Sequence, residues 1–370
     1  MTTMRDAGRP DEALIDLFRQ LGCVRVDTPV LQPAELFLDL SGEDIRRRLF
    51  VTTDADGREF CLRPEYTIPV GREHLRAGSE QADYCYLGPV FRQRAGESGE
   101  FVQAGVESLG RMDVGAADAD TLGIALEGLD LFPRRDVEVR VGDMGLLGAL
   151  LDALGTSAPA RRRLFRAIAA GRGLEAALAP EPGSGRSDYA GLLAAIEGQD
   201  PKAARAFVED VISIAGIAPV GGRTAGEIAE RFLSRAENRT GALSDRDRDV
   251  LRRYLAVAGD LDGASAEIGA LVRDAGLDLR AALDRFDERT GFIAARGIDL
   301  DRLSFSADFA RSLDYYTGFV FEVRDRGSPE ARYVIAGGRY DGLLQHLGAR
   351  DPVPAVGCSF WLDRLMGTPA

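Results

Sequence analysis

The order in which strand-like and helix-like patterns follow one another limits the fold of this chain most strongly. Short segments of alternating apolar and polar residues occur from Leu49 to Val141 and return after Leu300. Between them, residues 145–296 are rich in Ala, Leu, Arg, Asp and Glu at helical spacing. The economical interpretation is one α+β domain whose mostly antiparallel sheet, flanked by helices, is interrupted by a helical insertion. We therefore predict a discontinuous core formed by residues 1–145 and 300–370, with the insertion at residues 146–299.

Local patterns place the main elements. The first helix is expected from Asp11 to Gly22, and its apolar side should consist of Leu14, Leu17, Phe18 and Leu21. A hairpin is expected at residues 49–53 and 59–62, because Asp54-Ala55-Asp56-Gly57 between them is a turn sequence. Further strands are predicted at residues 84–90, 101–109, 137–141, 319–323, 333–336 and 355–360. Helices are predicted at residues 116–129, at 250–258, from Leu279 with Asp278 as cap, and from Trp361, whereas Glu181 to Gly185 should be a loop.

Composition and charge argue against several classes of protein. Over 370 residues, 46 basic and 59 acidic side chains sum to −13, so an extended surface for nucleic-acid phosphates is not expected. No stretch reaches 18 apolar residues and the N-terminus has no apolar signal core, so no membrane association is expected. The 4 cysteines and 2 histidines lack the spacing of metal ligands, and no metal or other cofactor is expected. A protein of the reducing cytoplasm is the simplest interpretation.

Four segments combine charged or aromatic residues with apolar strand residues. They are residues 62–67, residues 88–92 together with 103–107, residues 310–318 and residues 336–342. Buried charge is costly unless it is paired, so charges within strands indicate a ligand site or an ion-pair network. Alternation places Phe101, Gln103, Gly105 and Glu107 on one face of a strand, where they would form a pocket floor. Taken alone, a glycine-rich stretch such as 337–342 is more often a turn, and a strand glutamate is more often an ion-pair partner.

Together and in this order, these segments resemble the catalytic core of histidyl-tRNA synthetase, a class II aminoacyl-tRNA synthetase. Gly88-Pro89-Val90-Phe91-Arg92 resembles the class II motif 2 strand, and residues 355–364 resemble motif 3. Residues 311–316 and 337–343 resemble two histidine-specific motifs that other class II synthetases lack. The resemblance covers roughly residues 10–145 and 300–367, and the helical middle matches no motif of the family.

The resemblance implies a binding site for the two charged ends of L-histidine. Glu65, Thr67 and Gln103 would hold the ammonium group, and Arg92 and Arg311 would face the carboxylate. This division agrees with elementary chemistry, because a zwitterion needs an anion at one end and a cation at the other. For the set as a whole, the alternative is an internal salt-bridge network.

The resemblance also implies a site for the imidazole ring. Glu107 and Tyr316 would read the ring, Tyr340 would help to close the pocket, and Tyr315 belongs to the same histidine-specific motif. A carboxylate opposite the ring nitrogens selects a donor-bearing imidazole over an apolar ring.

Three departures from the synthetase pattern bear on catalysis. The chain ends six residues after Arg364, so no C-terminal anticodon-binding domain is expected. Motif 2 of the synthetases reads Phe-Arg-x-Glu, whereas this chain has Phe91-Arg92-Gln93-Arg94, so a cation replaces the glutamate that contacts adenine. The following loop carries Glu97 and Glu100, which would repel a triphosphate. Arg94 and Arg364 are therefore candidates for a vestigial nucleotide site, and no residue is assigned a catalytic role.

A synthetase-like core that keeps histidine recognition is similar to the regulatory subunits of ATP phosphoribosyltransferase, which are paralogues of histidyl-tRNA synthetase. The resemblance implies a non-catalytic subunit that activates a short catalytic subunit in the first step of histidine biosynthesis and confers feedback inhibition by L-histidine. It also implies a homodimer, paired through the counterpart of motif 1 at Val24–Leu40, within a hetero-oligomer. Two alternatives remain open: a truncated synthetase-like enzyme that forms histidyl-adenylate for a non-tRNA acceptor, and a histidine-binding dimer with an unrelated partner.

Overall fold

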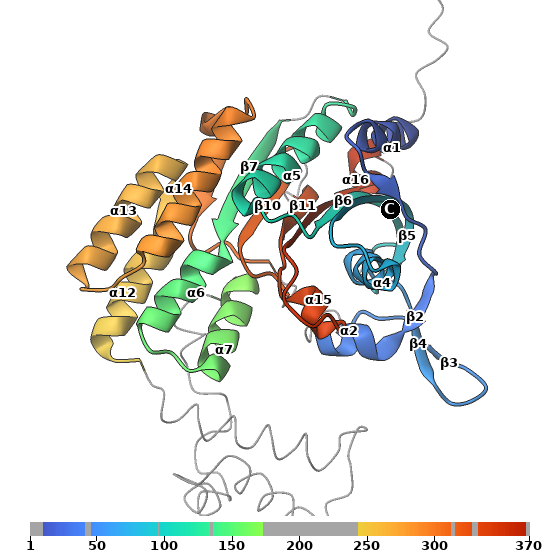
Figure 1. Ribbon diagram of the computed structural model, residues 1–370, viewed down its shortest axis with the longest axis horizontal. Coiled ribbons are helices and arrows are strands. Elements are labelled where there is room, and N and C mark those ends of the chain that lie inside the picture. Colours follow the sequence, from blue (N-terminus) through green and yellow to red (C-terminus); the bar gives the residue numbers. More distant parts are fainter. Residues whose placement is uncertain are drawn as a thin grey trace, which may run out of the picture. The chain divides into compact units, whose positions relative to one another are not determined.

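The computed structural model describes residues 10–40, 46–94, 96–133, 136–172, 243–311, 315–327 and 332–367. Its contacts divide the chain into two compact units, which are Met1–Ala149 with Arg253–Ala370, and Leu150–Arg252. The first unit contains both β-sheets and the helices that pack on them (Figure 1). Helix α7 (Ala158–Ala169) lies in the second unit, and it begins at Ser157, whose hydroxyl accepts a hydrogen bond from the amide of Ala160.

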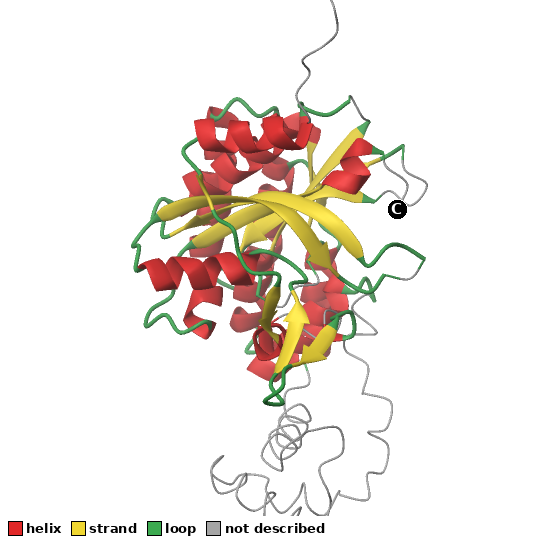
Figure 2. Cartoon of the chain, turned by 90° about the vertical axis from the view of Figure 1, so that its right-hand side faces the viewer, coloured by secondary structure: helices red, strands yellow, loops and turns green. Residues whose placement is uncertain are grey.

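A nine-stranded sheet, with the order β1-β5-β6-β12-β11-β10-β7-β9-β8, forms the centre of the first unit. Its strands are β1 (Val24–Arg25), β5 (Ala82–Phe91), β6 (Glu100–Leu109), β7 (Val137–Asp143), β8 (Ala258–Gly259), β9 (Leu303–Ser306), β10 (Phe319–Asp325), β11 (Tyr333–Arg339) and β12 (Ala355–Trp361). From β5 to β7 every neighbouring pair is antiparallel, whereas β1 pairs with β5 and β7 pairs with β9 in parallel. The predicted α+β class with a mostly antiparallel sheet is therefore confirmed, and Figure 2 shows helices on both sides of the strands.

A small three-stranded sheet, ordered β2-β4-β3, is formed by β2 (Leu31–Pro33), β4 (Glu59–Leu62) and β3 (Val51–Thr53). The predicted hairpin between β3 and β4 is confirmed. Its turn is held by Asp54, whose Oδ1 accepts from the amides of Asp56 and Arg58, and by Gly57 at a φ of +81°. That backbone conformation is readily adopted only by glycine.

The helices of the first unit pack on the two sheets or on one another. Besides α7, the described helices and the short 3-10 segment are α1 (Pro10–Gln20), α2 (Ala34–Leu40), α4 (Thr67–Ala77), α5 (Val114–Leu129), α6 (Met144–Ala153), α12 (Asp245–Leu255), α13 (Leu261–Asp274), α14 (Arg280–Ala295), η1 (Leu300–Arg302), α15 (Leu343–His346) and α16 (Leu362–Met366), of which α6 and α12 are each divided between the two units. Helix α5 packs on β11 and β12, helix α4 packs on β6, and Figure 1 shows β5 and β6 curving around α4. In α1, Leu14 and Phe18 are fully buried as predicted, whereas Leu21, expected on the same side, lies beyond the end of the helix and is 41% exposed; the ring of Phe18 lies 5.6 Å from that of Phe360.

One predicted element is wrong at its end. The helix expected at residues 250–258 stops at Leu255, and Ala258–Gly259 form the short edge strand β8, which pairs with Ser306 and Phe305 of β9. The amide of Ala307 also donates to the carbonyl of Val257. Backbone pairing with a strand that is distant in sequence thus replaces the last helical turn, which local periodicity does not reveal. The predicted loop at Glu181 to Gly185 lies outside the described residues.

The helical middle of the chain is divided between the two units. Helix α14 packs on α5, and α13 packs on α14 and β9, so residues 253–299 group with the sheet rather than with Leu150–Arg252. The exact bounds of the expected insertion, residues 146–299, stay a prediction.

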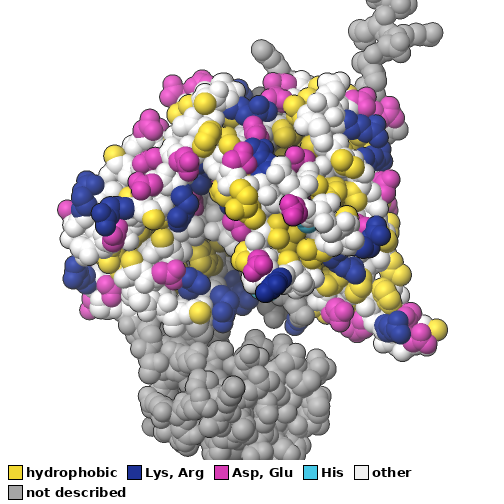
Figure 3. Space-filling view, viewed as in Figure 1, with side chains coloured by type: hydrophobic (Ala, Val, Ile, Leu, Met, Phe, Trp, Pro, Cys, Tyr) yellow, Lys and Arg dark blue, Asp and Glu magenta, His cyan; other side chains and the backbone are white. Residues whose placement is uncertain are grey.

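Among the helices that the structure describes, none combines the length and apolar character needed to span a membrane. Figure 3 shows acidic and basic side chains interspersed over one face of the described residues.

Candidate functional site

A pocket lies over the sheet at the N-terminus of α4. Its cavity volume is small, about 40 Å³, and the pocket is partly open to solvent. All nine residues that the sequence implicated in ligand binding line it: Glu65, Thr67, Arg92, Gln103, Glu107, Arg311, Tyr315, Tyr316 and Tyr340. Strands β5, β6, β11 and β12 supply the floor, and the segments around residues 65–67 and 315–316 supply walls. The predicted placement of Gln103 and Glu107 on one face of a strand is confirmed.

Glu65 combines a structural task with a place in the pocket wall. It precedes α4, and its carboxylate accepts from the amides of Thr67 at 2.6 Å and Ile68 at 3.1 Å, so it satisfies free donors at the helix start. Burial raises the pKa of Glu65, opposed by these hydrogen bonds and by Arg92. A carboxylate offers about four acceptor positions, so Glu65 keeps acceptor capacity for a donor in the pocket.

Glu107 lies at the centre of the pocket floor and is 2% exposed. Its Oε1 accepts from the hydroxyl of Thr67 at 2.7 Å, and its Oε2 accepts from the hydroxyl of Tyr340. Burial raises the pKa of Glu107 to about 8, although the hydroxyls of Tyr340 and Thr67 act against the rise. Gly357 pairs with Glu107 in the register of β12 and β6, and its missing side chain leaves the space that the carboxylate fills. A buried carboxyl surrounded by hydroxyl groups is suited to reading a polar ligand group.

Two arginines give the pocket a cationic side. Arg92 donates through Nε to the carbonyl of Pro64 at 2.6 Å, and burial lowers the pKa of its guanidinium. Arg311 lies with its guanidinium carbon 4.8 Å from the centre of the Tyr333 ring and 3.4 Å, through Nη1, from Glu322. Among the described residues, the buried Nε of Arg311 has no hydrogen-bond partner. The pocket therefore presents guanidinium donors that a bound anion can use.

Aromatic rings form much of the remaining wall. Tyr315 lies 5.1 Å from Tyr316 and 5.7 Å from Tyr340, measured between ring centres. Tyr66 and Tyr86 stack at 4.2 Å with nearly parallel planes. Such contacts fix ring positions and leave hydroxyl groups to face a ligand.

The two candidates for a vestigial nucleotide site, Arg94 and Arg364, do not line the pocket. They lie at the ends of a stack beside it, in which Arg94 covers Phe101 at 4.1 Å, Phe101 stacks on Trp361 at 4.4 Å, and Trp361 is covered by Arg364 at 3.8 Å. Arg94 also pairs with Glu97 at 2.6 Å. Both faces of this aromatic pair are thus covered by guanidinium groups of the chain itself.

Several lining residues were missed by the sequence analysis. They are Tyr66, Tyr86, Tyr333, Ala336, Gly357, Cys358, Ser359 and Trp361. Tyr86 lies on the same face of a predicted strand as Tyr84 and Gly88. Assigning the residues of that strand to its two faces would therefore have identified Tyr86 as a pocket candidate. The residues of β11 and β12 reach the pocket only through pairing with distant strands, for which a single sequence carries little signal.

The arrangement of charges in the pocket suits a zwitterionic ligand. Carboxylates and guanidiniums share one small pocket, as recognition of a zwitterion requires. Within the described ranges, no group of three or more His, Cys, Asp and Glu side chains is placed to hold a metal ion.

Comparison with known proteins adds a family context. The family model described as histidyl-tRNA synthetase matches residues 3–217 and 223–365. Proteins named ATP phosphoribosyltransferase regulatory subunit in Brucella canis and Brucella suis are 40% identical over 347 residues, which cover 92% of this chain and 92% of each relative.

Solved structures support the fold. One from Bacillus halodurans, described as an ATP phosphoribosyltransferase regulatory subunit/histidyl-tRNA synthetase, has a TM-score of 0.66 at 20% identity and covers 99% of this chain and 82% of its own. A histidine–tRNA ligase subunit from Alicyclobacillus acidocaldarius has a TM-score of 0.60 at 23% identity, with 99% and 94% covered. At these identities the likeness shows the fold alone, and the predicted class II synthetase-like architecture is confirmed.

Proposed function

Because the chain belongs to the family of ATP phosphoribosyltransferase regulatory subunits, which shares its fold with histidyl-tRNA synthetase, we propose that its pocket is the L-histidine sensor of a complex with the short catalytic subunit. The names of these relatives support a regulatory subunit of the first step of histidine biosynthesis over a truncated synthetase. In this proposal the chain performs no reaction of its own. It activates the catalytic subunit, and bound histidine reverses that activation.

One observation carries the proposal: the pocket brings together groups that complement every polar part of histidine. Arg92 and Arg311 would face the carboxylate, and Glu65, Thr67 and Gln103 would accept from the ammonium group. Glu107 and the tyrosines 315, 316 and 340 would enclose the imidazole ring. A ligand lacking ring donors would form no hydrogen bond with Glu107, which disfavours apolar amino acids of similar size.

The test uses the two purified subunits together. Adding this chain to the short catalytic subunit is expected to raise the rate of phosphoribosyl-ATP formation, and L-histidine is expected to lower it. Allosteric coupling of 1–3 kcal/mol corresponds to an effect of about 5- to 150-fold. L-phenylalanine serves as the control ligand, since it lacks ring donors.

Three outcomes of these experiments would contradict the proposed function, each in a different way. A complex insensitive to histidine would reject the sensor. Histidine-dependent exchange of pyrophosphate into ATP by the isolated chain would favour the synthetase-like alternative. The stacked rings of Phe101 and Trp361 argue against that alternative, because the guanidinium groups of Arg94 and Arg364 already cover them. A histidine effect on an unrelated co-purified protein would favour the other alternative, a histidine-binding dimer with an unrelated partner.

We also propose that a homodimer is the building block, paired through residues 24–40. Strand β1 lies at the edge of the large sheet, and apolar side chains are exposed in this part of the chain. Val24 is 61% exposed and Leu31 is 47% exposed. Exposed apolar side chains beside an unpaired strand edge are typical of a surface that pairs with another chain.

Val24→Asp is expected to convert the dimer into a monomer, because a charge placed in an apolar interface loses its hydration. Light scattering coupled to size-exclusion chromatography measures the mass. Met112→Asp is the matched control, since Met112 is an exposed apolar residue, at 80%, outside residues 24–40. A Val24→Asp chain that remains dimeric would place the interface elsewhere.

We place the protein in the cytoplasm as part of the same proposal. All four cysteines are free and buried, as expected where thiols stay reduced.

A further inference from the structure

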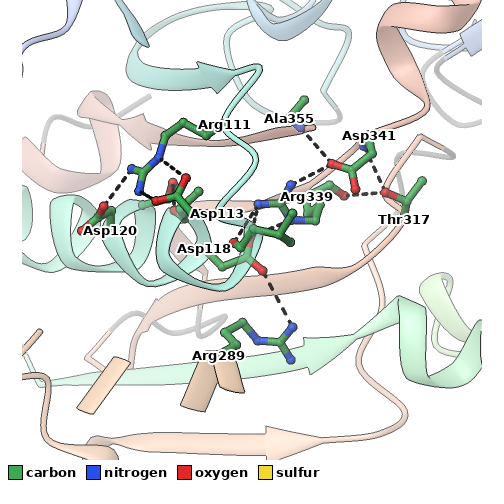
Figure 4. Close-up of polar contacts among 12 residues, drawn as sticks. Arg111, Asp113, Asp118, Asp120, Arg289, Thr317, Arg339, Asp341 and Ala355 are labelled. Atoms are coloured by element: carbon green, nitrogen blue, oxygen red, sulfur yellow. Dashed lines mark hydrogen bonds and ion pairs between the residues drawn. The ribbon is translucent and has the colours of Figure 1, made fainter. Parts of the chain in front are cut away.

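A buried network of charged residues lies behind the aromatic wall of the pocket. Asp118 of α5 accepts from Arg339 at the end of β11, with 2.8 Å between Nε and Oδ1. The other nitrogens of Arg339 donate to Asp341 at 2.8 Å and to the carbonyl of Val114 at 3.1 Å. Asp118 and Arg339 are 1% and 4% exposed. Figure 4 shows Arg339 between the two carboxylates, so every guanidinium nitrogen of Arg339 is engaged.

The network fixes both sides of the pocket wall at once. Tyr340 stands between Arg339 and Asp341, and its hydroxyl donates to Glu107. The amide of Thr317 donates to the carbonyl of Arg339 at 2.8 Å, and the amide of Asp341 donates to the hydroxyl of Thr317 at 3.1 Å. The segment carrying Tyr315 and Tyr316 is thereby joined to the turn carrying Tyr340.

A second connection approaches the same segment from α14. Arg289 donates to Asp143 at 2.5 Å and lies 3.7 Å from Asp118. Asp143 ends β7, and the amide of the next residue, Met144, donates to the carbonyl of Gly318. The positions of residues 315–318 are therefore tied to α5, α14 and β7 through charged side chains.

We propose that Asp118, through Arg339, is a positioning residue that holds Tyr340 and residues 315–317 in the geometry that binds histidine. A buried ion network rarely adds net stability over apolar packing, so its presence here is explained better by the geometry it imposes. Rigid support by residues outside the pocket is what a specific site requires. The inference rests on the proposed histidine site. It assigns a positioning role to Asp118 and Arg339, which do not line the pocket.

Histidine affinity tests the inference. Trp361, the only tryptophan of the chain, lines the pocket, so its fluorescence can follow a titration with L-histidine. Asp118→Asn is expected to weaken binding about 3- to 30-fold. Asp120→Asn is the matched control, because Asp120 lies on the same helix and pairs with Arg111 and Arg296 outside the pocket. The control is expected to bind as the original chain does.

A double-mutant cycle separates positioning from general destabilisation. In a Tyr340→Phe background, Asp118→Asn is expected to have less than half of its original effect on the logarithm of the affinity, because both changes act through one hydroxyl. An unchanged affinity in folded Asp118→Asn, or fully additive effects, would overturn the inference. If Asp118→Asn fails to fold, Thr317→Val replaces it as the test. Thr317 is exposed, and this change removes the acceptor for the amide of Asp341, so it is expected to weaken histidine binding; an unchanged affinity would overturn the inference.

A ligand-independent measurement distinguishes failure of this inference from failure of the proposed function. The amides of Thr317 and Met144 donate to the carbonyls of Arg339 and Gly318. Both amides are expected to exchange with deuterium faster in Asp118→Asn than in Asp120→Asn. If the original chain bound no histidine, the sensor proposal would fail, while equal exchange rates in the two variants would separately reject the positioning role.

Discussion

Glu107→Gln is expected to weaken L-histidine binding and, at the same time, to stabilise the ligand-free protein at pH 8. Above about pH 8, where Glu107 is ionised, the affinity is expected to fall because the amide replaces the carboxylate that would accept from the imidazole ring. A buried donor left without its partner costs about 1–3 kcal/mol, or roughly 5- to 150-fold in the dissociation constant. Calorimetric titration at pH 8.5 measures this loss. An unchanged affinity would remove Glu107 from the site.

The stability effect follows from the carboxyl group itself. The pKa of Glu107 is about 8 in the folded chain, against an ordinary value of 4.5. Between these pH values the carboxyl ionises in the unfolded chain but stays protonated in the folded chain, so the free energy of unfolding of the original protein falls as the pH rises. Above about pH 8 the stabilisation provided by the protonated carboxyl is fully lost. The total is on the order of a few kcal/mol. The amide of the Glu107→Gln variant does not titrate, so urea unfolding at pH 5.5 and 8 should show the advantage of the variant growing with pH. If the free energies of unfolding of both proteins changed equally with pH, the raised pKa of Glu107 would be contradicted.

Gly357→Ala is expected to abolish histidine binding and to destabilise the fold. A Cβ atom at this position would overlap Oε2 of Glu107 and lie 2.6 Å from the carbonyl oxygen of Val106. Backbone atoms of β6 cannot retreat without breaking the pairing with β12, so the carboxylate must leave its place. Overpacking of this kind costs about 1–3 kcal/mol, and the displaced Glu107 no longer reads a ligand. Thermal unfolding and titration with histidine measure the two effects.

Gly291→Ala is the control for that substitution. Gly291 lies in α14, and a Cβ atom built on it meets no atom within 4 Å. Alanine is favoured over glycine inside a helix by about 0.5–1 kcal/mol, so this variant should be slightly stabilised and should bind histidine normally. Normal binding by Gly357→Ala would show that Glu107 does not occupy the pocket floor.

Local patterns predicted much of the fold and of the site. The alternation of β6 was enough to place Gln103 and Glu107 on one face, because side chains of a strand alternate regardless of what the strand pairs with. The nine implicated residues also gather in one pocket, although their roles toward histidine stay predictions.

Features that depend on long-range pairing escaped the sequence analysis. Trp361 and Tyr333 reach the pocket through the registers of β12 and β11, and Ala258–Gly259 form a strand only because β9 lies beside them. Asp118 is similar, since an aspartate within a mostly apolar helix gives no indication that Arg339 will lie against it. In each case the deciding partner lies far away in the sequence.

The pairing of β6 with β12 also determines when the protein can begin to work during its synthesis. The two strands are adjacent in the sheet, yet β12 leaves the ribosome about 250 residues after β6. At roughly 5–20 residues per second, this interval lasts on the order of 10–50 seconds. Throughout that time one edge of β6, including the backbone beside Glu107, lacks its neighbour. If the pocket is the histidine site, a nascent chain is therefore not expected to bind histidine until β12 has emerged, and a chaperone that shields β6 should raise the yield of active protein.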